Sequence, residues 1–119
     1  MSENFAEKKD INEVSMQIIL NAGDARMIIN EALSCITSSD FEEADTKLKE
    51  AKKKISLAHS AQTETIQGEA RGEKIDFSLL FAHAQDTLMT IMSEWNTAKQ
   101  LIQLFKAYDE RLQKLEKNM

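Results

Sequence analysis

His83, Asp86, Thr87 and Thr90 are polar residues at spacings of three and four positions. Residues at those spacings share one face of a helix. A free imidazole has a pKa near ~6.5, so much of it is neutral at cellular pH and one ring nitrogen can act as a nucleophile. The spacing leaves two interpretations open. His83 is either such a nucleophile or a histidine that only packs, and the second role is the commoner one. The other histidine, His59, is assigned a structural or surface role.

Three helical segments are predicted to position these residues, over about residues 10–37, 40–67 and 76–116. The chain has 119 residues, three Gly and no Pro, and apolar residues recur at helical spacing in each segment. We expect Ser39 to cap the second segment and Asp76 or Ser78 to cap the third. Short connections between long helices favour antiparallel neighbours. The predicted fold is therefore all-α, an antiparallel up-down-up three-helix bundle in a single domain, residues 1–119.

Charge and hydropathy exclude several function classes. The formal net charge is -5, which argues against binding to the phosphate backbone of nucleic acid. No stretch approaches the ~20 apolar residues of a membrane span, and the opening residues MSENFAEKKD lack the apolar core of a signal peptide. We therefore expect a cytoplasmic location. Cys35, the only cysteine, is interpreted as a small buried hydrophobe.

The third helical segment has two apolar stripes, although a three-helix monomer needs only one. The second stripe implies self-association. Asp86 interrupts it, and in a cyclic trimer three copies of this carboxylate would meet near the axis and hold a hard cation such as Mg²⁺. The core stripe holds Phe77, Phe81, Ala84, Leu88, Ile91, Met92, Trp95 and Ile102. The second stripe holds Leu79, Leu80, His83, Asp86, Thr87, Thr90, Glu94, Thr97, Leu101, Leu104, Phe105, Tyr108, Leu112 and Leu115.

The segment SLLFAHAQDTLMT, residues 78–90, resembles the signature of the lactose/cellobiose (also diacetylchitobiose) family of phosphotransferase-system IIA proteins. IILNAGDAR (18–26) and AHSAQTETIQGEA (58–70) also resemble that family, in the expected order. The resemblance spans about residues 10–110, nearly the whole chain.

The resemblance implies a homotrimeric phosphocarrier in disaccharide uptake. His83 would accept a phosphoryl group from HPr and pass it, through a phosphohistidine intermediate, to a cysteine of the IIB component. The membrane component IIC would be an indirect partner. Asp86, one from each of three subunits, would bind one Mg²⁺ per trimer at the symmetry axis. Gln85, beside the histidine in the chain, would contribute to the active-site surface.

Thr87 departs from the family pattern. Family members commonly have a second histidine here, giving HAQDH, and threonine cannot ionise in its place. We expect its hydroxyl to be able to donate to a phosphoryl oxygen. The departure favours an alternative function, a catalytically silent helical trimer that binds a partner or acts as a regulator. A plain coiled-coil adaptor is a third alternative, against which HAQD inside the stripe argues.

Overall fold

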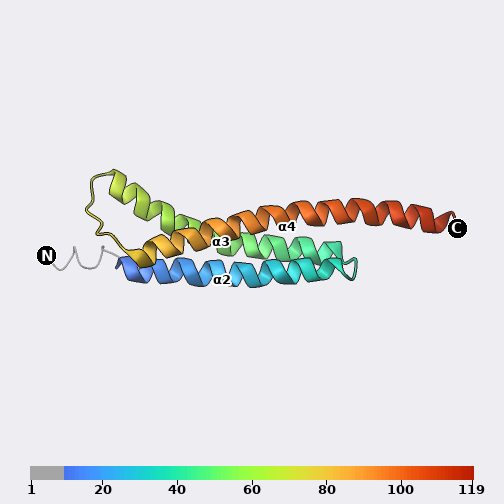
Figure 1. Cartoon of the computed structure of the whole chain (residues 1–119), viewed down its shortest axis with the longest axis horizontal. Helices are drawn as coiled ribbons and strands as arrows, with labels where there is room; N and C mark the ends of the chain where they lie inside the picture. The colour runs from blue at the N-terminus through green and yellow to red at the C-terminus, as the bar shows by residue number, and fades with distance from the viewer. Residues whose placement is uncertain (1–9) are drawn as a thin grey trace.

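The computed structural model describes residues 10–119. They form three helices, α2 (Ile11–Ile36), α3 (Phe41–Ala70) and α4 (Leu79–Lys117). Helices α2 and α4 run in the same direction and α3 runs opposite to both (Figure 1). The all-α, up-down-up prediction is confirmed for these residues. The prediction of a single domain over residues 1–119 includes residues 1–9, which lie outside the described part. The prediction that the opening residues are not a signal peptide also concerns these residues. None of the described helices is long and apolar enough to cross a membrane.

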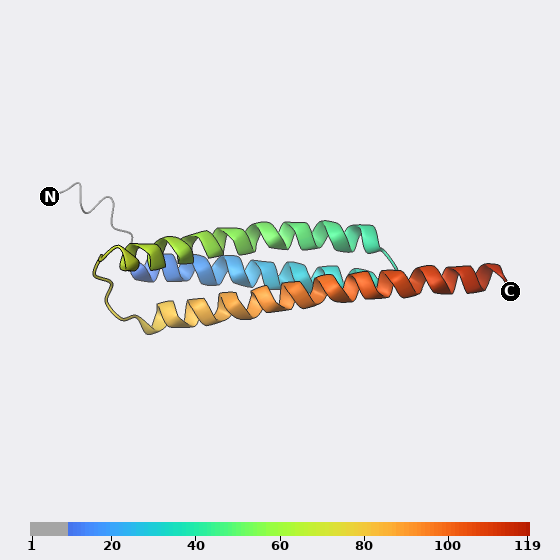
Figure 2. The ribbon, with the colours of Figure 1, turned by 90° about the horizontal axis from the view of Figure 1, so that it is seen from above.

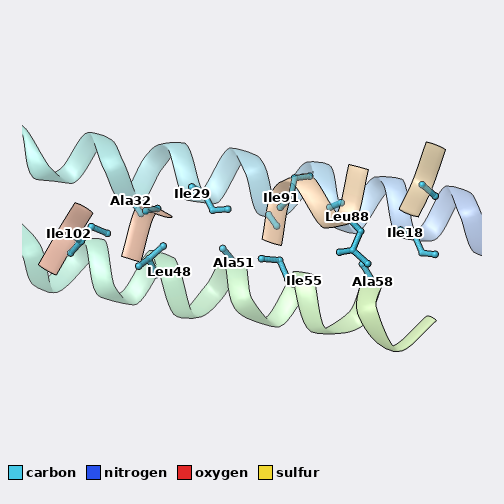
Figure 3. Packing of buried hydrophobic residues seen from close by; sticks show 14 of the residues in the cluster. Ile18, Ile29, Ala32, Leu48, Ala51, Ile55, Ala58, Leu88, Ile91 and Ile102 are labelled. Carbon is cyan, nitrogen blue, oxygen red and sulfur yellow. The ribbon is translucent and has the colours of Figure 1, made fainter. Parts of the chain in front are cut away.

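The core is a single layer of small and branched apolar side chains between the three helices. Leu88 and Ile91 of α4 lie between side chains of α2 and α3 (Figure 3). Fully buried alanines occur on every helix, and their small size lets the helices approach closely. The buried apolar residues are Val14, Ile18, Ala22, Ala25, Ile29, Ala32, Ala44, Leu48, Ala51, Ile55, Ala58, Ala84, Leu88, Ile91, Ala98 and Ile102.

Side chains cap the start of each helix, though not always the expected ones. The carboxylate of Asp10 accepts the backbone N–H of Asn12, and that of Asp40 accepts the N–H of Glu43, both at 3.1 Å. The prediction of a Ser39 cap is wrong. Ser39 has a φ of 57° and makes the turn, so Asp40 is the first residue whose backbone permits capping.

Helix α4 begins later than the predicted residue 76, because Ser78 caps it. The Ser78 hydroxyl accepts the backbone N–H of Phe81 at 3.1 Å. Phe77 therefore precedes the helix and is 88% exposed, and the prediction that it lies in the core is wrong. Phe81, Met92 and Trp95 are partly buried and pack against the core as expected.

Polar contacts between helices show which residues of neighbouring helices lie at the same height along the bundle axis. The guanidinium of Arg26 in α2 donates two hydrogen bonds to the carboxylate of Glu94 in α4, both at 3.1 Å. The indole N–H of Trp95 donates to the carbonyl oxygen of Leu48 in α3 at 2.8 Å. The Arg26–Glu94 pair is exposed and adds little stability, but it aligns the parallel helices α2 and α4.

The last turns of α4 extend past the rest of the bundle (Figure 2). The hydroxyl of Ser39, in the turn between α2 and α3, lies 3.4 Å from the carboxylate of Asp109. Beyond that point α4 continues to Lys117, about 12 Å further. At this level and beyond it, Tyr108, Leu112 and Leu115 are 51%, 55% and 62% exposed. Helix α4 thus has a second apolar stripe that the other helices of the subunit do not cover.

Candidate functional site

His83 lies in the second turn of α4 and is exposed to solvent. Its imidazole has no hydrogen-bond or ion-pair partner among residues 10–119. Both ring nitrogens are therefore available from outside the subunit, as a nucleophile requires. The helix around it is continuous from Leu79 to Lys117, which fixes the backbone that presents the ring.

Asp86 is also exposed, one turn further along the same stripe. Its carboxylate forms no ion pair or hydrogen bond within the described residues. No group of three or more His, Cys, Asp or Glu side chains in that part of the chain could hold a metal ion. At this position one subunit therefore offers the single unpaired carboxylate of Asp86. Three symmetry-related copies would supply the oxygen ligands that a hard cation prefers.

Thr87 lies on the same face, but its hydroxyl is already engaged. It donates to the backbone carbonyl oxygen of His83 at 2.8 Å, and Thr90 donates to that of Asp86 at the same distance. A hydroxyl has one proton to donate. In this conformation Thr87 can only accept a further hydrogen bond, so the expected donation to a phosphoryl oxygen is not supported.

Gln85 lies on another side of α4. It is two residues from His83, which corresponds to about 200° around a helix. Gln85 is half-buried and lines a hollow of about 200 Å³ with the end of α3 and the segment before α4. The subunit therefore does not bring Gln85 to the imidazole, and its role at the active site stays a prediction.

Arg26 and Arg71 form ion pairs with residues other than His83. Arg26 pairs with Glu94, which is 11 residues from His83 and so about 17 Å along the helix. Arg71 pairs with Glu73 at 3.8 Å in the connection between α3 and α4.

An exposed apolar face on α2 was not among the sequence-based predictions. Met16, Leu20 and Met27 are exposed and lie on the side of α2 opposite its buried residues. The spacing of four and seven residues was the available signal. Because Arg26 is level with Glu94, Met16 is level with Ala84, next to His83. This apolar face is therefore at the height of His83 along the bundle, on the outer side of α2 that points away from the core.

The chain resembles known proteins along most of its length. Residues 13–106 match the family model described as PTS system, Lactose/Cellobiose specific IIA subunit. The lichenan-specific phosphotransferase enzyme IIA component of Bacillus subtilis is 41% identical over 103 residues, 87% of this chain and 94% of that protein. The lactose-specific EIIA component of Staphylococcus epidermidis is 37% identical over 83% of this chain and 95% of its own length.

Solved structures of IIA proteins are also similar to this chain in fold. The crystal structure of the cellobiose-specific enzyme IIA from Bacillus anthracis aligns with a TM-score of 0.80 at 40% identity, covering 88% of this chain and 96% of that one. The IIA(Chitobiose) chain of a IIA(Chitobiose)–HPr complex aligns with a TM-score of 0.75 at 31% identity, covering 86% and 99%.

Proposed function

The chain belongs to the lactose/cellobiose-specific IIA family of the sugar phosphotransferase system, and from that premise we propose that His83 carries the phosphoryl group. The observation that supports this proposal is the exposed, unpaired imidazole on a rigid helix. Its substrate is phosphorylated HPr, and its product passes to the cysteine of a IIB component during disaccharide uptake through IIC.

The transfer consists of two displacements at phosphorus. A neutral ring nitrogen of His83 attacks the phosphorus atom held by HPr. The bond between phosphorus and HPr breaks, and a phosphorus–nitrogen bond forms on His83. The cysteine sulfur of IIB then attacks the same phosphorus, and the bond to His83 breaks and leaves the ring free. Such transfer depends mainly on alignment and charge stabilisation, which a helix-mounted ring assists by fixing the direction of attack.

The apolar face of α2, at the height of His83 along the bundle, is proposed as a docking surface for a partner. Met16, Leu20 and Met27 are exposed, and Met16 is level with Ala84. Flexible, polarisable methionine side chains adapt to different partner surfaces. A carrier that must bind a donor and an acceptor in turn needs this property, and a related IIA protein has been solved in complex with HPr.

The second stripe of α4 supports a homotrimer in which three copies of α4 pack around one axis. Leu112 and Leu115 lie beyond the turn between α2 and α3, and neither of those two helices covers them or the exposed Tyr108. Burial of apolar area contributes about 25 cal/mol per Å², so a symmetric arrangement that covers all three copies is favourable. His83 lies on the same stripe and would be at the seam between subunits.

Asp86 would then hold one Mg²⁺ per trimer. The unpaired carboxylate of each subunit fits a hard cation bound by three oxygen ligands and completed by water. When bound, the ion neutralises the acidic charge near His83, where it would otherwise oppose an incoming phosphoryl dianion. Two carboxylates about 4 Å apart repel by roughly 4 kcal/mol at an effective dielectric of 20, so the ion would also stabilise the assembly.

Incubation of the protein with phosphoenolpyruvate, enzyme I and HPr tests the proposed function. We expect a mass increase of one phosphoryl group per chain that is lost in acid, as a phosphorus–nitrogen bond requires. Purified IIB should then remove the group. The absence of any mass increase would contradict the proposal and favour the silent binding protein, which Thr87 suggests.

The substitution Asp86→Leu tests the metal site. Leucine removes the charge while it fits an apolar seam, so we expect the trimer to persist and the bound divalent ion to be lost. Elemental analysis after dialysis gives the metal content, and light scattering on a sizing column gives the mass of the assembly. A chelator should weaken the unmodified trimer and have no effect on the variant. Unchanged metal content in the variant would show that the ligand assignment is wrong.

A further inference from the structure

A second polar site lies between α3 and α4, on the opposite side of α4 from His83. It is an open hollow of about 290 Å³ lined by Lys52, Ile55, Ser56, His59, Ser60 and Met92. Met92 is nine residues from His83, which is about 180° around the helix. We call this hollow the Lys52 groove. Its lining offers an ammonium, an imidazole and two hydroxyls above an apolar floor, and it contains no carboxylate, although the chain has 20 acidic residues.

The ammonium of Lys52, one of the residues that line the groove, is held over the ring of Trp95. The indole ring is held by its hydrogen bond to the carbonyl oxygen of Leu48, and the Lys52 nitrogen lies 4.3 Å from the ring centroid. A second ammonium, that of Lys99, lies 5.5 Å from the same centroid. Neither lysine forms an ion pair within residues 10–119. Cation–π contact leaves the positive charge in place, so both charges remain available to an anion.

The two serine hydroxyls of the groove are free, unlike most others in these helices. Thr46, Thr65, Thr87 and Thr90 each donate to the carbonyl oxygen four residues earlier. In the described part of the chain, Ser56 and Ser60 make no side-chain hydrogen bond. Each can turn its proton towards a ligand.

The imidazole of His59 adds one more donor. Its Nδ1 lies 3.5 Å from the hydroxyl of Thr63. When that hydroxyl donates to Nδ1, the neutral ring carries its proton on Nε2, which can then donate to a ligand. Residues 52, 56, 59 and 60 occupy successive turns of one helix face. The groove therefore presents an ammonium and three neutral donor groups on one face of α3.

We propose that the Lys52 groove binds the phosphate of a small phosphomonoester. The three terminal oxygens of such a group suit one ammonium and several neutral donors. The buried Ile55 and the partly buried Met92 would contact the organic part of the ligand. A volume of about 290 Å³ is near the lower limit of small-molecule sites, which favours a ligand the size of a monosaccharide phosphate. This proposal does not depend on phosphoryl transfer at His83.

Titration of the isotope-labelled full chain with glucose 6-phosphate, followed by amide and histidine-ring NMR, tests the proposal. We expect saturable shifts at residues 52–60, at Met92 and at the His59 ring. Glucose should produce none. Inorganic phosphate should bind the same residues at least several-fold more weakly, because it lacks contact with Met92. Equal affinity for inorganic phosphate would overturn the role given to the apolar floor.

Matched lysine variants separate a built site from general charge attraction. Lys52→Met should weaken glucose 6-phosphate binding about tenfold or more, since a hydrogen bond to a charged group is worth that factor. Ser56→Ala should weaken it by a smaller factor. Lys53→Met, at the adjacent position and outside the groove, removes the same charge and should leave binding unchanged. Equal losses in the two lysine variants, or shifts that do not saturate, would overturn the proposal.

Discussion

His83→Ala is expected to abolish phosphoryl acceptance while the helical bundle stays intact. The imidazole is exposed and makes no contact that the fold requires, so its loss should change the free energy of unfolding by no more than about 0.5 kcal/mol. The proposed reaction, in contrast, loses its nucleophile. Mass spectrometry after incubation with phosphoenolpyruvate, enzyme I and HPr should detect no acid-labile phosphoryl group. Thermal unfolding followed by circular dichroism should match that of the unmodified protein.

A substitution elsewhere on α4 provides the control. Asn96 is exposed and lies 13 residues from His83, on the opposite side of the helix. Asn96→Ala should be phosphorylated at the normal rate. Fragmentation of the phosphorylated unmodified chain should locate the group on His83 and not on His59, since these are the only two histidines. Phosphorylation that persists in His83→Ala would refute the assignment.

The three helices could be predicted because each buries a single apolar stripe at regular spacing. Ala44, Leu48, Ala51, Ile55 and Ala58 recur every three or four residues, and all five are buried. Burial of a repeated stripe depends on helix geometry alone. The sequence therefore determines this part of the core with little dependence on tertiary detail.

The ends of the helices were harder to predict, because several residues can act as caps. Ser39 and Asp40 are both good capping residues, and the backbone decides between them. Ser39 adopts a left-handed conformation in the turn, which leaves Asp40 to accept the N–H of Glu43. Asp76 and Ser78 are likewise both good capping residues. Because Ser78 is the cap, Phe77 precedes the helix and lies outside the core.

The sequence predicts which residues of the candidate site share one face of α4, but it does not predict the contacts that their side chains make. His83, Asp86 and Thr87 share the predicted stripe, and the spacing alone indicates this. The spacing also indicates that Gln85 lies on another side, so its inclusion rested on adjacency in the sequence. The hydrogen bond from Thr87 to the carbonyl oxygen of His83 depends on a side-chain rotamer that no sequence pattern specifies.

Helix α4 links the proposed phosphoryl site at His83 and the proposed metal site at Asp86 to the proposed trimer. His83 and Asp86 occupy the same stripe of α4 that ends in the projecting apolar segment. A projecting helix with Tyr108, Leu112 and Leu115 more than half exposed would leave apolar area in water in a monomer. Three such helices around an axis would cover this area and align three copies of Asp86. The proposed metal site therefore depends on the projecting segment, about 39 Å away along α4 from Asp86 to Leu112.

Leu112→Glu is accordingly expected to convert the trimer to monomers. Each subunit would lose the burial of a leucine side chain, about 2 kcal/mol. Each subunit would also place a carboxylate close to the same carboxylate of two other subunits, in a seam that is otherwise apolar. Light scattering on a sizing column and sedimentation velocity should show a mass close to one chain. Metal content should fall together with the mass, because a lone Asp86 provides only one of three carboxylates.

Lys114→Glu provides the matched control for this substitution. Lys114 is exposed and lies two residues further along, about 200° around the helix from Leu112. The same glutamate placed there faces solvent, so the trimer and its metal content should be retained. A trimer that survives Leu112→Glu would show that the projecting stripe is not the subunit interface. Dissociation of both variants would show that added negative charge, and not the apolar contact, controls assembly. Only loss of the trimer in Leu112→Glu alone agrees with three copies of α4 packed on this stripe.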